Sequence, residues 1–98
     1  MTVTYRSYVE YDDEGEVWFT ESSTIPGLGA SAKDVDKVVS SLNLLAPHML
    51  RENVYQRKDA KLPKYDGPSE VEHEVVVIER DGRAIRKPAT KINVYEFS

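Results

Sequence analysis

Apolar and polar positions alternate strictly over residues 3–11, VTYRSYVEY. One face of this segment would carry Val3, Tyr5, Ser7, Val9 and Tyr11. A period of two with aromatic and β-branched residues is typical of a half-buried strand. Residues 12–15, Asp-Asp-Glu-Gly, predict a turn in which Gly15 is free to take positive φ. Because residues 16–22 read as a returning strand, the sequence predicts a β-hairpin.

The second strand carries Trp18, the one tryptophan of the chain. Val17 and Phe19 share the strand face opposite to it. If Phe19 faces a helix, Trp18 lies on the outer face, where an exposed indole would mark an interface. In the reverse register Trp18 belongs to the core. The alternation leaves both registers open.

A proline–glycine pair interrupts the strand pattern after the hairpin. Pro26 fixes φ and lacks an N–H, and Gly27 suits the following turn position, so we expect a structural turn at these two residues. A short strand over residues 28–31 follows in this interpretation. Ser31 is then the expected N-cap of a helix, with Asp34 three residues later as an acidic capping box.

The helix is predicted from apolar residues that recur at three- and four-residue steps. This stripe consists of Val35, Val38, Val39, Leu42, Leu45, Ala46, Met49 and Leu50. Pro47 removes one ladder hydrogen bond, so we expect the helix to kink or break there before a final turn. Asn53 is expected to close the helix in the left-handed conformation.

The remainder predicts a polar connection and further strands. Residues 54–70 form a long polar loop, and residues 71–80 form a strand whose run Val75–Ile78 indicates burial on both faces. Asp81-Gly82 marks a turn, and residues 91–97 form a last strand. The expected order is β-β-β-α-β-β, an α+β two-layer sandwich of one helix on an antiparallel sheet.

Length and composition fit one globular domain over residues 1–98, in which 1–53 are the hairpin and helix, 54–70 the loop and 71–98 the C-terminal strands. The chain of 98 residues is 40% hydrophobic and 31% charged. It has no cysteine and only two histidines, so we expect no disulfide, no metal site and no cofactor. No apolar run reaches the roughly 20 residues of a membrane helix. Without a signal-peptide pattern, a cytoplasmic protein with no membrane partner is expected.

The net charge of −4 is unevenly distributed. Residues 1–50 hold three basic and eight acidic side chains, whereas residues 51–98 hold ten and nine. An acidic hairpin favours a basic protein partner over a nucleic acid, since phosphate repels carboxylates. The candidate partner-binding residues are Asp12, Asp13, Glu14, Trp18, Tyr55 and Arg57.

Catalytic interpretations find little support in the spacing. The acidic residues of the hairpin crowd one turn, whereas a calcium loop spreads its ligands and catalytic carboxylates converge from separate elements. His48 and His73 have no Ser or Asp at a spacing that suggests a triad, although triads assemble in space. The expectation is a protein without enzyme activity.

Two basic stretches support a different hypothesis. Residues 51–64 and 80–87 interleave Arg and Lys with Tyr and aliphatic side chains, a composition that can hold single-stranded nucleic acid. A nucleic-acid-associated protein using these loops is therefore the first alternative.

The segment from Tyr5 to Asn53 resembles the HicB-like family. The resemblance is carried by the tyrosine-rich first strand, the acidic turn, Val17-Trp18 in the second strand and Ile25-Pro26-Gly27-Leu28. A helix that ends Ala46-Pro47-His48-Met49-Leu50-Arg51-Glu52-Asn53 completes it. The resemblance implies a β-β-β-α-β fold, a partial RNase H-like fold that lacks the catalytic carboxylates.

HicB-like proteins are antitoxins that occlude a small basic toxin and often form homodimers. The resemblance therefore implies a toxin-like basic partner and a homodimer, and the acidic first half suits such a partner. No evident helix-turn-helix or ribbon-helix-helix tail follows the helix, so operator binding is not expected. The leading hypothesis is a non-enzymatic protein-binding module, an antitoxin or an orphan relative. A phage or mobile-element protein that inhibits a host factor is the second alternative.

Overall fold

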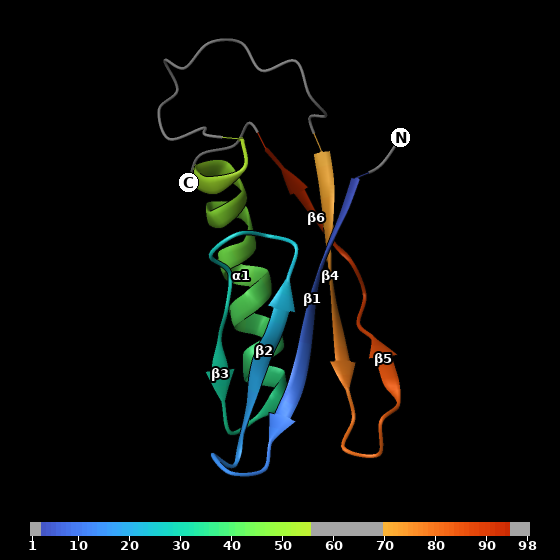
Figure 1. The fold of residues 1–98 in the computed structure, drawn as a ribbon. Coiled ribbons are helices and arrows are strands. Elements are labelled where there is room, and N and C mark those ends of the chain that lie inside the picture. The colour runs from blue at the N-terminus through green and yellow to red at the C-terminus, as the bar shows by residue number, and fades with distance from the viewer. Residues whose placement is uncertain (1–2, 56–69, 95–98) are drawn as a thin grey trace.

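The computed structural model describes residues 3–55 and 70–94, which form one helix against a six-stranded sheet (Figure 1). The elements are β1 (Val3–Asp12), β2 (Val17–Ser23), β3 (Ser31–Ala32), α1 (Val35–Asn53), β4 (Glu70–Ile78), β5 (Ala84–Arg86) and β6 (Thr90–Asn93). The α+β class and the two-layer arrangement are therefore as predicted.

The strand order is β3-β2-β1-β4-β5, and β6 also pairs with β4. All pairs are antiparallel except the central pair β1–β4, which is parallel and runs in register from Val3 opposite Val71 to Val9 opposite Val77. Three strands rather than two follow α1, because residues 84–86 pair with the end of β4 as a separate strand. The predicted order was wrong in that respect.

The hairpin of β1 and β2 forms where the alternation predicts it, and its inward face is also as predicted. Val9 is fully buried against the helix, and Val3 and Tyr5 pack against the same core. The turn differs, because Glu16 rather than Gly15 adopts positive φ, at 56°. The amide of Glu16 donates to the carbonyl of Asp12, which places the left-handed residue immediately before β2.

Trp18 follows the second of the two open registers. It pairs with Tyr11, lies on the helix side of the sheet and packs against the core. Phe19 pairs with Glu10 on the opposite face. A bulge between Tyr8 and Val9 accompanies this register. Trp18 is therefore not the exposed indole that the alternative register would give.

The helix begins at Val35, with Asp34 rather than Ser31 as its N-cap. The Asp34 carboxylate accepts the amide hydrogen of Asp36 at 2.9 Å. Ser31 cannot cap the helix because it pairs with Phe19 as part of β3. The short strand predicted over residues 28–31 accordingly lies at Ser31–Ala32.

The helix continues through Pro47 without a break and ends at Asn53. Pro47 withholds one N–H, but the neighbouring Ala46 and Leu50 are fully buried against the sheet and hold the helix in place. Val54 forms the C-cap in a right-handed conformation, so the prediction of a left-handed Asn53 was wrong. The Asn53 side chain instead donates to the carbonyl of Pro26 at 2.7 Å.

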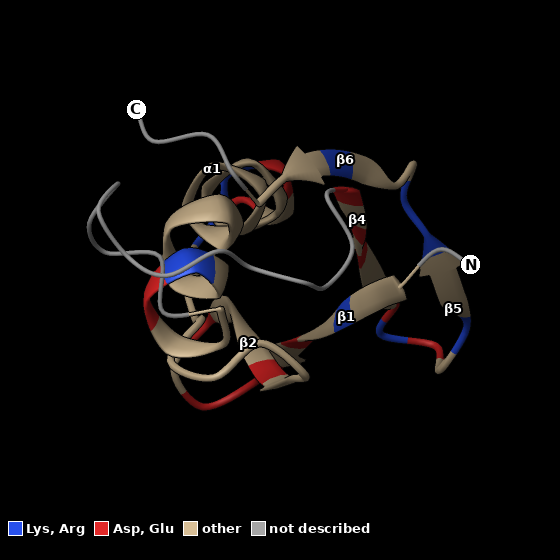
Figure 2. Ribbon diagram, turned by 90° about the horizontal axis from the view of Figure 1, so that it is seen from above, with Lys and Arg blue, Asp and Glu red and all other residues tan. Residues whose placement is uncertain are grey.

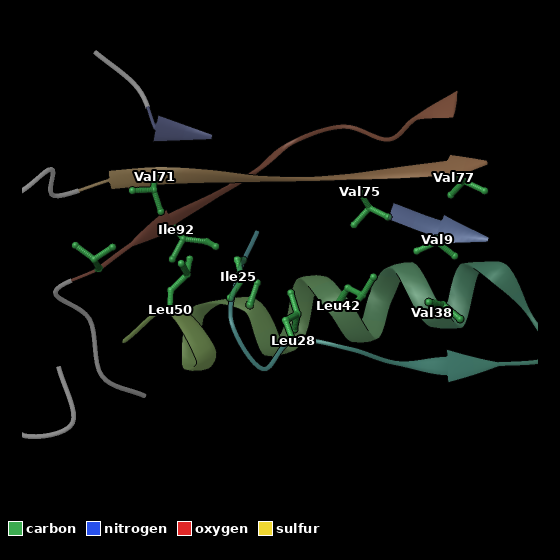
Figure 3. Close-up of a cluster of buried hydrophobic side chains, with 12 residues drawn as sticks. Val9, Ile25, Leu28, Val38, Leu42, Leu50, Val71, Val75, Val77 and Ile92 are labelled. Atoms are coloured by element: carbon green, nitrogen blue, oxygen red, sulfur yellow. The ribbon is translucent and has the colours of Figure 1, made fainter. Parts of the chain in front are cut away.

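The core lies between α1 and the sheet, as Figure 3 shows. Its buried members are Val9, Ile25, Leu28, Val38, Leu42, Ala46, Leu50, Val71, Val75, Val77, Ile92 and Val94. Within β4, Val75, Val76 and Val77 are all at most 5% exposed, so burial on both faces is confirmed. Leu45, which the stripe places in the core, is 37% exposed.

Parts of three predictions lie outside the described residues. These are most of the loop 54–70, the basic stretch 51–64 beyond Tyr55, and the end of the last strand, of which Thr90–Asn93 is seen as β6. Over the residues that the structure describes, no helix is long and apolar enough to cross a membrane.

Candidate functional site

The turns of two hairpins lie at the same end of the sheet (Figure 1). Because β1 and β4 are parallel neighbours, their C-terminal ends meet at one edge. From there β1 turns into β2 on one side, and β4 turns into β5 on the other. The tips of the two hairpins therefore lie on either side of the line between β1 and β4.

A cleft of about 350 Å³ occupies this position between the hairpin tips. Its lining consists of Glu10, Tyr11, Asp13, Ile78, Glu79, Arg80 and Gly82. Residues from both hairpins therefore form one cleft, although about 65 residues of sequence separate them.

Arg80 joins the two sides of the cleft. Its Nη2 lies 3.0 Å from Oδ1 of Asp13, and its guanidinium carbon lies 4.4 Å from the ring centroid of Tyr11. Tyr11 packs edge-on against Trp18, with ring centroids 5.3 Å apart. The Arg80 and Asp13 side chains are 65% and 79% exposed, so this ion pair stabilises the fold by less than about 1 kcal/mol.

Three of the predicted partner-binding residues form the tip of the first hairpin. Asp12 is half-buried, and its Oδ1 accepts the amide hydrogen of Glu14 at 3.0 Å, so it shapes the turn. Asp13 and Glu14 are exposed, and Asp13 pairs with Arg80. The carboxylates of this turn thus face solvent beside the cleft.

The other predicted partner-binding residues lie elsewhere. Trp18 lies behind the tip, where it packs against the Tyr11 ring and against the core. Tyr55 lies at the opposite end of the sheet, where its hydroxyl and that of Tyr5 share a hydrogen bond of 2.7 Å. Arg57 lies outside the described residues. The structure therefore does not bring Tyr55 to the acidic turn.

The predicted structural turn docks on the end of the helix. Gly27 has φ +81°, and a Cβ at this position would lie 2.8 Å from Nδ2 of Asn53. The same Nδ2 donates to the carbonyl of Pro26. The positive φ therefore favours glycine here, and a Cβ would displace the Asn53 amide from its bond with Pro26.

A buried polar network around His73 is the feature that sequence reasoning missed. Nε2 of His73 lies 2.8 Å from Oγ of Ser7, and Nδ1 lies 3.0 Å from Oδ1 of Asn43. Oγ of Ser7 is also 2.9 Å from Oγ of Ser23. Ser7 lies on the inward face of β1, and His73 lies on the inward face of β4 beside Val75. A polar residue on an otherwise apolar strand face is the sequence signal that could have found them.

The serine–histidine–asparagine order resembles that of hydrolytic sites. However, Ser7 and His73 are both fully buried between sheet and helix, so no substrate reaches the hydroxyl. Burial lowers the pKa of His73 below its ordinary value, which keeps the ring neutral at pH 7. This arrangement supports a structural role.

His48 lies on the exposed side of the helix and pairs with a residue of the same helix. Its side chain is 61% exposed, and Nε2 lies 3.1 Å from the carboxylate of Glu52, one helical turn away. Over residues 3–55 and 70–94, no group of three or more His, Cys, Asp or Glu residues is placed to hold a metal ion.

The basic stretch 80–87 is largely paired with carboxylates. Arg80 pairs with Asp13, and Arg83 pairs with Asp81 at 2.8 Å. Lys and Arg residues gather around β5 in Figure 2, next to acidic residues of the same turn.

Arg86 pairs with Glu74 on the sheet face away from the helix, at 2.9 Å, and Arg6 reaches the other oxygen of the same carboxylate at 3.1 Å. These bonds, that of Arg86 first, lower the pKa of Glu74. Three of the arginines in this stretch therefore have acidic partners within the protein.

These features define a small α+β protein with a cleft between two hairpin tips at one end of its sheet. The chain belongs to the family described as a domain of unknown function, DUF1902, whose family model matches residues 4–63. That match includes β1, β2, the proline–glycine turn and α1. No curated protein and no solved structure matches the chain.

Proposed function

We propose that this protein is a non-enzymatic binding module that occludes a basic protein partner through the acidic turn of its first hairpin. The observation that carries the proposal is the exposed turn with Asp13 and Glu14, which lies beside the cleft at the carboxyl ends of β1 and β4. An antitoxin, or an orphan relative of one, is the specific form that we propose.

Electrostatic complementarity supports a basic partner. Glu10, Asp12, Asp13, Glu14 and Glu16 lie within seven consecutive residues at the end of the hairpin. Over the described residues, only Asp13 of this group pairs with a cation. A positively charged surface would gain from this field both in association rate and in orientation.

The surroundings of the other candidate residues favour this function over nucleic-acid binding and over catalysis. Arg80, Arg83 and Arg86 each lie beside a carboxylate, and these carboxylates would repel a phosphate backbone. Ser7 and His73 are buried, which disfavours catalysis by that pair. Neither observation bears on binding by the acidic turn.

The resemblance to HicB-like proteins points in the same direction. The β-β-β-α-β order that it implies is present from β1 to β4. β5 and β6 pair with β4 at the edge of the sheet opposite to β2 and β3, so these two strands leave the acidic turn uncovered. A homodimer is part of the proposal, and sedimentation equilibrium tests it.

Affinity capture from a lysate of the source organism tests the proposed function. The immobilised protein is expected to retain a protein of net positive charge at about 50 mM salt and to release it as salt rises towards about 500 mM, where charge interactions are screened. Mass spectrometry then names the partner. Recovery of nothing at low salt, or of a partner that is acidic and insensitive to salt, contradicts the proposal.

A further inference from the structure

We infer that the cleft between the two hairpin tips is a receptor for an arginine side chain of the partner, and that Arg80 holds the guanidinium position in its wall, over Tyr11 and beside Asp13, in the free protein. This inference rests on the proposed function and names the chemistry that its site recognises. The position supports it first, because residues of both hairpins line one cleft where β1 and β4 end side by side.

The lining of the cleft selects a cation. Glu10 and Asp13 come from the first hairpin and Glu79 from the second, against the single positive charge of Arg80. Among the described residues, neither Glu10 nor Glu79 pairs with a cation. The cleft therefore keeps spare negative charge with Arg80 in its wall.

The aromatic wall selects a guanidinium over other cations. The guanidinium of Arg80 lies 4.4 Å from the ring centroid of Tyr11, within the range of a cation–π contact. Trp18 packs against the edge of that ring and fixes its orientation. A planar guanidinium can stack on the ring and pair with a carboxylate at the same time, whereas an ammonium group is more strongly hydrated.

Arg80 can be replaced at low cost. Its side chain and that of Asp13 are both largely exposed, so little free energy is lost when their ion pair breaks. An incoming arginine would take over its contacts with Tyr11 and Asp13 and add Glu10 and Glu79. Because Arg80 competes for the same place, it weakens the apparent affinity of the free protein for its ligand.

An amide NMR titration with two probe peptides tests this inference, one of five arginines and one of five lysines. The arginine peptide is expected to shift the amides of residues 10–13 and 78–82 together. Arg80→Ala should bind it about two- to fivefold more tightly than the unaltered protein, the scale of one exposed cation–π contact. Arg83→Ala is the matched control, because it removes the same charge from the same turn outside the cleft lining and should not reproduce this gain.

A second variant tests the aromatic wall. In the Arg80→Ala background, Tyr11→Leu should abolish the preference for arginine over lysine, and amide dispersion shows whether it folds. If it does not fold, the comparison of Arg80→Ala with Arg83→Ala decides alone.

Equal affinities for those two variants overturn the inference. So do shifts confined to residues 13–16, a result that leaves binding by the acidic turn intact. The lysate capture fails independently if the protein has no basic partner, which separates failure of the cleft from failure of the proposed function.

Discussion

The hydroxyl of Ser7 and Nε2 of His73 lie 2.8 Å apart where the central parallel strands meet the helix, and both side chains are fully buried. One direction of donation satisfies the whole network. The amide of Ile25 donates to Ser23, Ser23 to Ser7, Ser7 to Nε2, and Nδ1 donates to Asn43. The imidazole is then neutral and carries its proton on Nδ1.

Replacement of His73 should therefore be costly. His73→Ala leaves a cavity and removes the partner of Ser7 and of Asn43, so we expect the free energy of unfolding to fall by about 3 kcal/mol. Urea unfolding measures the change. His48→Ala, at an exposed position, should stay within about 0.5 kcal/mol. Equal effects of the two substitutions would show that the network does not stabilise the fold.

The same network predicts loss of stability in mild acid. Burial lowers the pKa of folded His73 below 6.5, so the unfolded chain binds the proton at higher pH than the folded protein does. The stability contributed by neutral His73 is present above pH 6.5 and decreases as pH falls from there towards the folded pKa. The slope is at most about 1.4 kcal/mol per pH unit. Urea unfolding of His73→Ala over the same pH range should lack this component, and an unchanged slope would contradict the assignment.

Glu74 acts in a separate, more acidic window. Arg86, and then Arg6, lowers the pKa of folded Glu74 below 4.5, so its stabilising contribution is present above that value and is lost as pH falls below it. Glu74→Gln should destabilise the protein by about 1–2 kcal/mol at pH 7, less than a fully buried pair because both guanidiniums are exposed. The difference from the unaltered protein should shrink below pH 4.5. A constant difference across pH would exclude the ionised carboxylate as its cause.

The turn at Pro26-Gly27 gives a prediction with an internal control. Gly27→Ala places a Cβ against Asn53 at positive φ, and we expect a loss of about 2 kcal/mol in thermal or urea unfolding. Gly29 has ordinary φ and open space around it, so Gly29→Ala should be neutral or slightly stabilising. If both substitutions cost the same, contact between the turn and the helix is not the reason for the glycine.

Local sequence patterns were sufficient to predict which residues of a strand are buried. The alternation of β1 placed Val9 correctly inside, and the run Val75–Val77 indicated burial on both faces. The helix start was misplaced because Ser31 has two competing roles. Its capping propensity is local, whereas its pairing with Phe19 depends on the strand beside it.

The site depended on pairing that no local pattern reveals. β1 and β4 are parallel, and residues as distant in sequence as Val3 and Val71 pair between them, so their register cannot be inferred from either segment alone. This pairing places Ser7 beside His73 and Asp13 beside Arg80. The acidic turn was visible in the sequence, but the cleft beside it and its arginine were not.

Capture with charge-matched variants tests whether the acidic turn binds the basic partner. The first bait carries Asp12→Asn, Asp13→Asn and Glu14→Gln, where asparagine at position 12 can still accept the turn hydrogen bond. The control bait carries Glu21→Gln, Asp36→Asn and Glu70→Gln, three exposed positions outside the turn. We predict that the basic partner retained by the unaltered protein is lost from the first bait and kept by the control. Retention of that partner on both baits, or its loss from both, would contradict binding through the acidic turn.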